Sequence, residues 1–136
     1  MKKSKKLIIN TDGSSLSNPG PAGIGIVVYN NQNDIIEKIS KYIGKATNNV
    51  AEYKAIIEAL SFAKDFGADE VMIRSDSELI VKQINGSYRV KDKKLKILLK
   101  EALNLTGNFS TFSIVHIPRE ENRIADDLAK RAAALE

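Results

Sequence analysis

Cysteine and tryptophan are absent from this sequence, and histidine occurs once, at position 116. The chain can therefore form neither disulfides nor thiolate metal sites, which is compatible with a reducing compartment. No apolar run is long enough to cross a membrane, and the run that follows the basic residues 2–6 is interrupted at Asn10 and Asp12, unlike a signal peptide. These absences predict a cytoplasmic protein with no membrane partner.

What the sequence does contain is an ordinary share of core-forming residues, since 43% of its 136 residues are hydrophobic and 28% are charged. This size and composition predict one globular domain over residues 1–136. Residues 1–5 are expected to form a flexible basic tail, with a binding arm as the alternative. The net charge of +4 and the pI near 9.2 mildly favour a polyanionic partner.

Hydrophobic periodicity predicts an α/β fold. Apolar or alternating runs predict strands over residues 7–12, 23–29, 35–43, 71–76 and 109–117. Capping residues and apolar stripes predict helices over residues 47–66, 77–86 and 122–135, and one more with Leu95, Leu98, Leu99, Ala102 and Leu103 buried. The first strand is expected to end at Asp12 and to turn sharply at Gly13. A strand–helix–strand crossover would make the strands that end in Asp12 and Asp76 parallel.

Four acidic residues lie where this fold could bring them to one edge of the sheet. Asp12 and Asp76, on adjacent parallel strands, would repel each other unless a cation lay between them. Taken singly, Asp12-Gly13 could be a plain turn, and Glu52 could be an acid favoured by the helix dipole. With Asp126 they form an all-oxygen ligand set that suits Mg²⁺ or Mn²⁺. Such clusters hold two ions about 3.5–4 Å apart and cleave phosphodiesters.

Several segments carry a resemblance to a known family: Thr11-Asp12-Gly13-Ser14, Asn18-Pro19-Gly20-Pro21, residues 47–53, Ser75-Asp76-Ser77, residues 118–122, Ala125-Asp126 and Leu128-Ala129. In this order, and over nearly the whole chain, they resemble ribonuclease HI in its short archaeal-like form without the basic protrusion. The resemblance implies a five-stranded mixed sheet in the order 3-2-1-4-5, with strand 2 antiparallel and helices on both faces. It also implies an endonuclease that hydrolyses the RNA strand of RNA/DNA hybrids and leaves 5′-phosphate and 3′-hydroxyl ends. We expect the chain to act as a monomer, with the hybrid and double-stranded RNA as candidate partners.

The resemblance also implies roles for individual residues. Asp12 would bridge two Mg²⁺ or Mn²⁺ ions, Asp126 would complete the site of the water-activating ion, and Glu52 and Asp76 would hold the other ion. With Arg119, these are the predicted catalytic residues. The residues expected to contact the substrate are Gly13, Ser14, Asn18, Lys45, Thr47, Asn48, Asn49 and Glu78.

The expected substrate contacts divide by strand. Asn18, Asn48 and Asn49 match positions that touch the minor groove of the hybrid, where short amides can donate to and accept from 2′-hydroxyls. Thr47, with Lys45 beside it, matches a pocket for a phosphate of the DNA strand. The backbone at Gly13 and Ser14 is expected to approach the RNA strand.

The sequence departs from the family pattern in three places. The loop before the last acid is short, so Arg119 takes the place of the mobile histidine of many bacterial relatives, while His116 lies too early. Glu78 stands where relatives often have glutamine. The basic handle of some relatives is missing between Gly86 and Lys94, where lysines offer only weak compensation.

Two other functions remain open at this point. One is a non-catalytic nucleic-acid-binding module, which the presence of all four acids disfavours. The other is a related nuclease that cuts double-stranded RNA, because amides that read a 2′-hydroxyl do not separate a hybrid from double-stranded RNA. The same amides disfavour a nuclease specific for DNA.

Overall fold

A five-stranded sheet forms the centre of the computed structural model, which describes residues 5–135. Its order is β3-β2-β1-β4-β5, and β2 runs antiparallel to both of its neighbours, whereas β1, β4 and β5 are mutually parallel. The predicted α/β fold class and strand order are thus confirmed. The strands are β1 (Lys6–Ser15), β2 (Gly20–Tyr29), β3 (Ile35–Ala46), β4 (Glu70–Ser75) and β5 (Thr111–His116).

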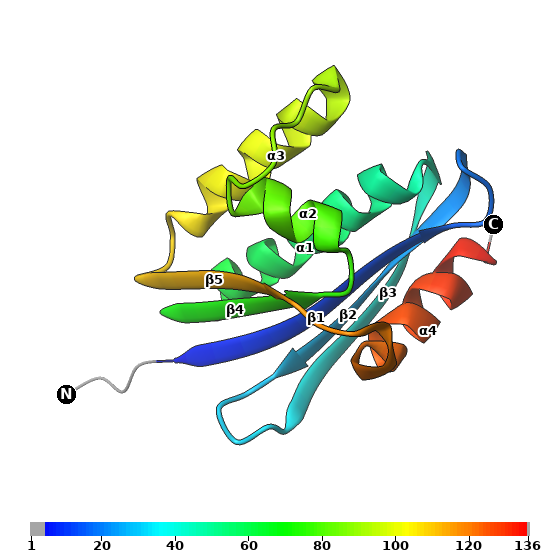
Figure 1. Ribbon diagram of the computed structural model, residues 1–136. Coiled ribbons are helices and arrows are strands. Elements are labelled where there is room, and N and C mark those ends of the chain that lie inside the picture. The colour runs from blue at the N-terminus through cyan, green and yellow to red at the C-terminus, as the bar shows by residue number, and fades with distance from the viewer. Residues whose placement is uncertain (1–4, 136) are drawn as a thin grey trace.

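Helices cover both faces of this sheet, as Figure 1 shows. On one face lie α1, which packs on β1 and β2, and then α2 and α3; on the other face α4 packs on β1, β2 and β3. The elements are α1 (Asn48–Phe66), α2 (Glu78–Ile84), α3 (Lys93–Thr106), the short 3₁₀ turn η1 (Arg119–Glu121) and α4 (Arg123–Ala133).

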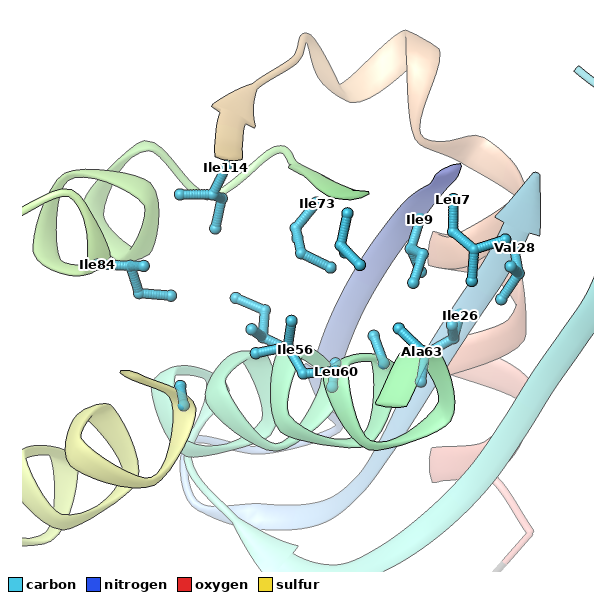
Figure 2. Close-up of a cluster of buried hydrophobic side chains, with 14 of the residues drawn as sticks. Leu7, Ile9, Ile26, Val28, Ile56, Leu60, Ala63, Ile73, Ile84 and Ile114 are labelled. Carbon is cyan, nitrogen blue, oxygen red and sulfur yellow. The ribbon is translucent and has the colours of Figure 1, made fainter. Parts of the chain in front are cut away.

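The main hydrophobic core lies between the sheet and α1 (Figure 2). Because side chains alternate along a strand, Leu7 and Ile9 of β1 point toward this helix together with Ile26 of β2. They meet Ile56 and Leu60, which are one turn apart on α1. Fully burying a side chain of this size contributes about 1.5–3 kcal/mol, so this layer fixes α1 on the sheet.

The ends of α1 follow from capping chemistry. Thr47 accepts a hydrogen bond from the Val50 N–H through its side-chain hydroxyl at 3.2 Å, and Gly67 ends the helix in the left-handed region at φ +83°. Ser77 caps α2 in the same way, although α2 ends at Ile84, two residues before the predicted end at Gly86. The start of α1 matters for function because it places Glu52 in the second turn, pointing at β1.

The prediction that β1 ends at Asp12 is wrong. The antiparallel ladder with β2 continues through Gly13 and Ser14 to Ser15, and only the parallel pairing with β4 stops, at Thr11 and Ser75. Gly13 therefore makes no turn. A Cβ atom there would lie 2.2 Å from the carbonyl carbon of Ala51, so glycine is required because α1 crosses β1 at backbone contact.

The buried faces of α3 and α4 are both narrow, and that of α3 is narrower than the sequence predicts. In α3, Leu103 is 44% exposed and Ala102 is fully buried, because this helix packs mainly on α1 rather than on the sheet. In α4, Leu128 is half-buried while the alanines lie against β2. A Cβ at Gly25 would lie 2.0 Å from the Ala125 carbonyl oxygen, so the helix rests directly on the strand backbone.

Residues 1–4 of the predicted basic tail lie outside the described residues. Lys5 is held in place, because its N–H donates to Asp69 Oδ2 at 2.9 Å and its carbonyl accepts from the Asp69 N–H at 2.8 Å. Between residues 5 and 135, none of the helices combines the length and the apolar character needed to cross a membrane.

Candidate active site

Carboxylates from four separate segments meet beside the point where β4 leaves the sheet. Thr11 and Ser75 form the last parallel pair, so Asp12 follows on β1 and Asp76 comes directly after the end of the adjacent strand β4. Oxygens of Asp12, Glu52 and Asp76 all lie within 4.8 Å of one another. Asp126, on α4, lines the same cavity as Asp12 and Asp76 and is close enough to Asp12 to raise the pKa of its carboxyl. The four predicted acids therefore form one cluster.

This cluster is poorly suited to carry its full negative charge without a counterion. Asp12 is 5% exposed and Glu52 is 9% exposed. Burial, reinforced by the charges of Glu52 and Asp76, raises the pKa of Asp12 to about 9. Burial likewise raises the pKa of Glu52 to about 8, against the lowering effect of a hydrogen bond from Gly13.

A divalent cation reverses this balance, because it favours the ionised form of each carboxylate that it contacts. The donor set consists only of carboxylate oxygens, which are the ligands that hard cations such as Mg²⁺ and Mn²⁺ prefer. The residues present therefore fit divalent metal ions. This fit rests on the buried like charges and on the chemistry of the donors.

Glu52 is fixed relative to β1 by a direct bond. The Gly13 N–H donates to Glu52 Oε1 at 2.7 Å. The bond forms because α1 approaches Gly13 so closely that no side chain would fit between them. The same bond occupies the Gly13 N–H, so this group is not free to donate to another partner.

A cavity of about 260 Å³ opens over the acids. It brings four further predicted residues to the site: Gly13, Ser14, Asn48 and Arg119. Asp12, Asp76 and Asp126 line its acidic side. Arg119 is exposed on η1 and supplies positive charge at the rim.

Lys130 also lines this cavity, although it was not among the residues predicted from the sequence. Its Nζ lies 3.0 Å from Asp126 Oδ2. The available signal was the spacing of four residues between Asp126 and Lys130 on one helix, which places them one turn apart. That signal becomes informative only once Asp126 is known to face the other acids.

The second set of predicted substrate contacts lines a separate cavity of about 520 Å³. The predicted residues there are Asn18, Lys45, Thr47 and Asn49. The start of α3 adds Asp92 and Lys94, which were not predicted to lie beside these residues. Their contribution depends on how α3 packs against α1, which local sequence patterns do not encode.

The asparagines between the two cavities are linked to one another. The Ser15 N–H donates to Asn48 Oδ1 at 2.9 Å, and the Asn48 N–H donates to Asn18 Oδ1 at 3.0 Å. These bonds tie the loop after β1 to the start of α1. They orient both side chains by their carbonyl oxygens.

Two residues singled out from the sequence lie outside both cavities. Glu78 is exposed at the start of α2 and pairs with Lys82 at 3.1 Å, which lowers the pKa of the Glu78 carboxyl. His116 is exposed at the end of β5 and thus lies within the strand, as predicted. The structure does not bring either residue together with the acids.

Comparison with known proteins agrees with this geometry. Residues 10–132 match the family described as Reverse transcriptase-like. Ribonuclease HI of Halobacterium salinarum is 43% identical over 121 residues, which are 89% of this chain and 61% of that protein. A bifunctional protein of Mycobacterium tuberculosis is 40% identical over 128 residues, which are 93% of this chain and 35% of that protein. The chain thus spans less than two thirds of the length of these relatives.

Solved structures give the same result for the fold. RNase H1 from Halobacterium salinarum superimposes with a TM-score of 0.93 at 40% identity, covering 95% of this chain and 98% of that one. LC11-RNase H1, solved in complex with an RNA/DNA hybrid, superimposes with a TM-score of 0.88 at 43% identity, covering 94% of this chain and 96% of that one. With its sheet order, its cluster of acids and these similarities, the chain belongs to the ribonuclease HI family.

Proposed function

We propose that this chain is a metal-dependent endoribonuclease that hydrolyses the RNA strand of RNA/DNA hybrids and leaves 5′-phosphate and 3′-hydroxyl ends. The observation that carries the proposal is the convergence of Asp12, Glu52, Asp76 and Asp126 in one cluster, with three of these acids lining one cavity. A relative with 43% identity, LC11-RNase H1, was solved with such a hybrid, which supports the choice of substrate.

The proposed cofactor is Mg²⁺ or Mn²⁺, with two ions per site when substrate is bound. Asp12 would contact both ions, Asp126 would complete one site, and Glu52 with Asp76 would complete the other. When bound, such ions supply Lewis acidity that lowers the pKa of an attacking water and stabilises the leaving oxygen. The all-carboxylate donor set supports this choice of metals.

The cations around the acids have a different task in this proposal. Arg119 lines the cavity beside the acids, and Lys130 lies one helical turn from Asp126. Both can approach a phosphodiester that enters the cavity and attract its negative charge. Arg119, on the exposed η1, is proposed to help the cleaved product leave.

Recognition of the RNA strand is proposed to depend on Asn18, Asn48 and Asn49. In Asn18 and Asn48 the carbonyl oxygen already accepts a backbone hydrogen bond, so the NH₂ groups are the donors that remain for a ligand. A 2′-hydroxyl can accept such a bond, and deoxyribose has no equivalent group. Short amides can both donate and accept, and the two bonds to the carbonyl oxygens of Asn18 and Asn48 support a role as donors in this proposal.

The complementary DNA strand is proposed to place a phosphate in the larger cavity. Thr47 uses a hydroxyl lone pair to cap α1, which leaves its O–H free to donate. Lys45 adds a positive charge on the same wall. A hydroxyl and an ammonium group together suit a phosphate oxygen.

We propose that the chain acts as a monomer, since the proposed mechanism requires no residue from a second subunit. The lack of cysteine and the proposed nucleic-acid substrate support a cytoplasmic location.

The test is to offer labelled RNA/DNA hybrid, double-stranded RNA, double-stranded DNA and single-stranded RNA side by side. Each substrate is incubated with Mg²⁺, Mn²⁺ or a chelator, and the product ends are determined. The proposal predicts cleavage of the hybrid with a divalent ion only, and loss of cleavage with retained binding in Asp76→Asn. Faster cleavage of double-stranded RNA than of the hybrid would show that double-stranded RNA is the main substrate. Binding of the hybrid without cleavage would show that the chain is a non-catalytic binding module.

A further inference from the structure

Asn122 links the segments that carry three of the four acids, although it is no acid itself. Its side chain is 1% exposed. Its Nδ2 group donates to the Thr11 carbonyl at 2.9 Å and lies 3.4 Å from Asp76 Oδ2. Thr11 immediately precedes Asp12 on β1. A single amide thus touches the strand of one acid and the carboxylate of another.

The backbone of Asn122 holds the third segment. Its carbonyl accepts from the Asp126 N–H at 3.0 Å, and its own N–H donates to the Arg119 carbonyl at 3.0 Å. The first bond opens α4 one turn before Asp126, and the second closes η1. Asn122 is therefore the junction between the 3₁₀ turn that presents Arg119 and the helix that presents Asp126.

We infer that Asn122 is a positioning residue, whose amide sets the separation of Asp12, Asp76 and Asp126. The inference rests on the proposed function, because it assigns Asn122 to the assembly of that same site. The residue touches no reacting group itself. It acts through the Asp76 carboxylate and the backbone of β1.

The direction of the amide is fixed by its neighbours. A backbone carbonyl and a carboxylate can only accept, so the NH₂ group of Asn122 must face them. The NH₂ group has two hydrogens, one for each of these two acceptors. No residue that keeps the shape but lacks the donors can replace it, and aspartate in particular would put a further negative oxygen against Asp76.

The bond to Asp76 has no substitute within residues 5–135. In that part of the chain, the Asn122 amide is the one hydrogen-bond donor to the Asp76 carboxylate. Glu52, in contrast, is fixed by the backbone of Gly13. Removing the Asn122 amide would therefore release Asp76 and leave Glu52 in place.

Loss of this amide is not expected to unfold α4. The helix is seated on β2 by the direct contact of Ala125 and Ala129 with the backbone at Gly25 and Gly23, which does not involve Asn122. Asn122→Ala should thus fold and still be defective. This separates a positioning role from a merely structural one.

The experiment compares Asn122→Ala and Asn122→Asp with a matched control, Asn85→Ala. Asn85 also donates from Nδ2 to a strand carbonyl, that of Ile114 at 3.4 Å, but it lies outside the acid cluster. Outer partners of metal ligands typically change metal affinity or activity by about 10–100-fold. We expect kcat on the hybrid to fall by about that factor in Asn122→Ala, and further in Asn122→Asp, with KM changed less than about threefold.

A second measurement does not depend on cleavage. The Mg²⁺ concentration that half-saturates the backbone NMR shifts of Gly13 and Asp76 is measured in protein without substrate. We expect it to rise by about tenfold in Asn122→Ala and to stay unchanged in Asn85→Ala. Unfolding by urea reports whether each variant is folded.

The outcomes separate the two proposals. If the wild type cleaves and Asn122→Ala matches Asn85→Ala in both kcat and Mg²⁺ binding, the positioning role is wrong. If the wild type cleaves nothing but Asn122→Ala still weakens Mg²⁺ binding, the proposed function fails and the positioning role stands. If Asn122→Ala changes only its unfolding midpoint, the residue is structural and the inference is overturned.

Discussion

Gly13 and Glu52 are joined by a 2.7 Å hydrogen bond across a contact in which β1 and α1 touch backbone to backbone. The two residues are 39 positions apart in the sequence. A Cβ atom on residue 13 would lie 2.4 Å from the Glu52 nitrogen. The distance between Asp12 and Glu52 is therefore set by the absence of a side chain at Gly13.

Gly13→Ala should damage both stability and activity. The helix or the strand must shift to admit the methyl group, and overpacking of this kind costs about 1–3 kcal/mol. The shift also separates Glu52 from Asp12, so we expect kcat to fall by about 100-fold. Urea unfolding and steady-state cleavage of a hybrid measure the two effects.

Gly107→Ala is the control for that substitution. Gly107 ends α3 at φ −65°, and the nearest atom to an added Cβ lies at an ordinary 3.4 Å. We expect its free energy of unfolding to stay within about 0.5 kcal/mol of the wild type. Equal effects of the two alanines would show that the close approach at Gly13 is not the cause.

Asp12→Asn should stabilise the metal-free protein. The pKa of Asp12 rises from 3.8 to about 9 on folding without metal, so between these pH values the folded state holds a proton that the unfolded state has lost. Stability of the wild type therefore falls as pH rises through this window, by up to about 1.4 kcal/mol per pH unit for one proton. Because asparagine cannot ionise, Asp12→Asn does not lose stability in this way as pH rises.

The wild type and Asp12→Asn are unfolded with urea at pH 5, 7 and 9 in the presence of a chelator. Asp127→Asn, which changes the charge by the same amount, is the control. Asp127 is exposed on α4. We expect the advantage of Asp12→Asn to grow with pH and to shrink when Mg²⁺ is added. A constant difference across pH would contradict the raised pKa of Asp12.

The sequence predicts much of this site because its signals are local. Asp12 and Asp76 follow apolar strand runs, and the carboxyl ends of parallel strands share one edge. Thr47 and Gly67 mark the limits of α1 by their capping chemistry alone. Each of these inferences needs only residues within one element and its ends.

Other parts of the site depend on contacts between distant elements. Gly13 permits a close approach, but the sequence around it is equally typical of a turn. Lys130 and Asn122 gain meaning only from the way α4 lies on β1 and β2, and Leu103 stays exposed because α3 rests on another helix. None of these arrangements follows from periodicity in a single segment.

Arg119→Ala should slow turnover more than it weakens binding. Arg119 lines the acidic cavity from the exposed turn η1, so it can act on the product without being needed to assemble the acids. We expect kcat to fall by about tenfold and KM to change by less than about twofold. Arg131→Ala, on the exposed side of α4, should behave as the wild type. An unchanged kcat in Arg119→Ala would remove this residue from the site.

Lys45→Ala should weaken binding of the hybrid and leave kcat unaltered. Lys45 lines the cavity proposed to hold a DNA-strand phosphate, together with Thr47. Loss of one phosphate contact lowers the steepness of log K against log salt by about 0.9, because one fewer counterion is released on binding.

Lys38 is exposed on the same strand but lines neither cavity, so Lys38→Ala is the matched control. Filter binding of a hybrid to the Asp76→Asn protein, at several salt concentrations, measures both slopes without cleavage. Equal slopes for the two lysine variants would show that Lys45 contributes only general positive charge. A lower slope in Lys45→Ala alone would locate the phosphate in this cavity. Thr47→Ala should then also weaken binding of the hybrid, without a change in slope.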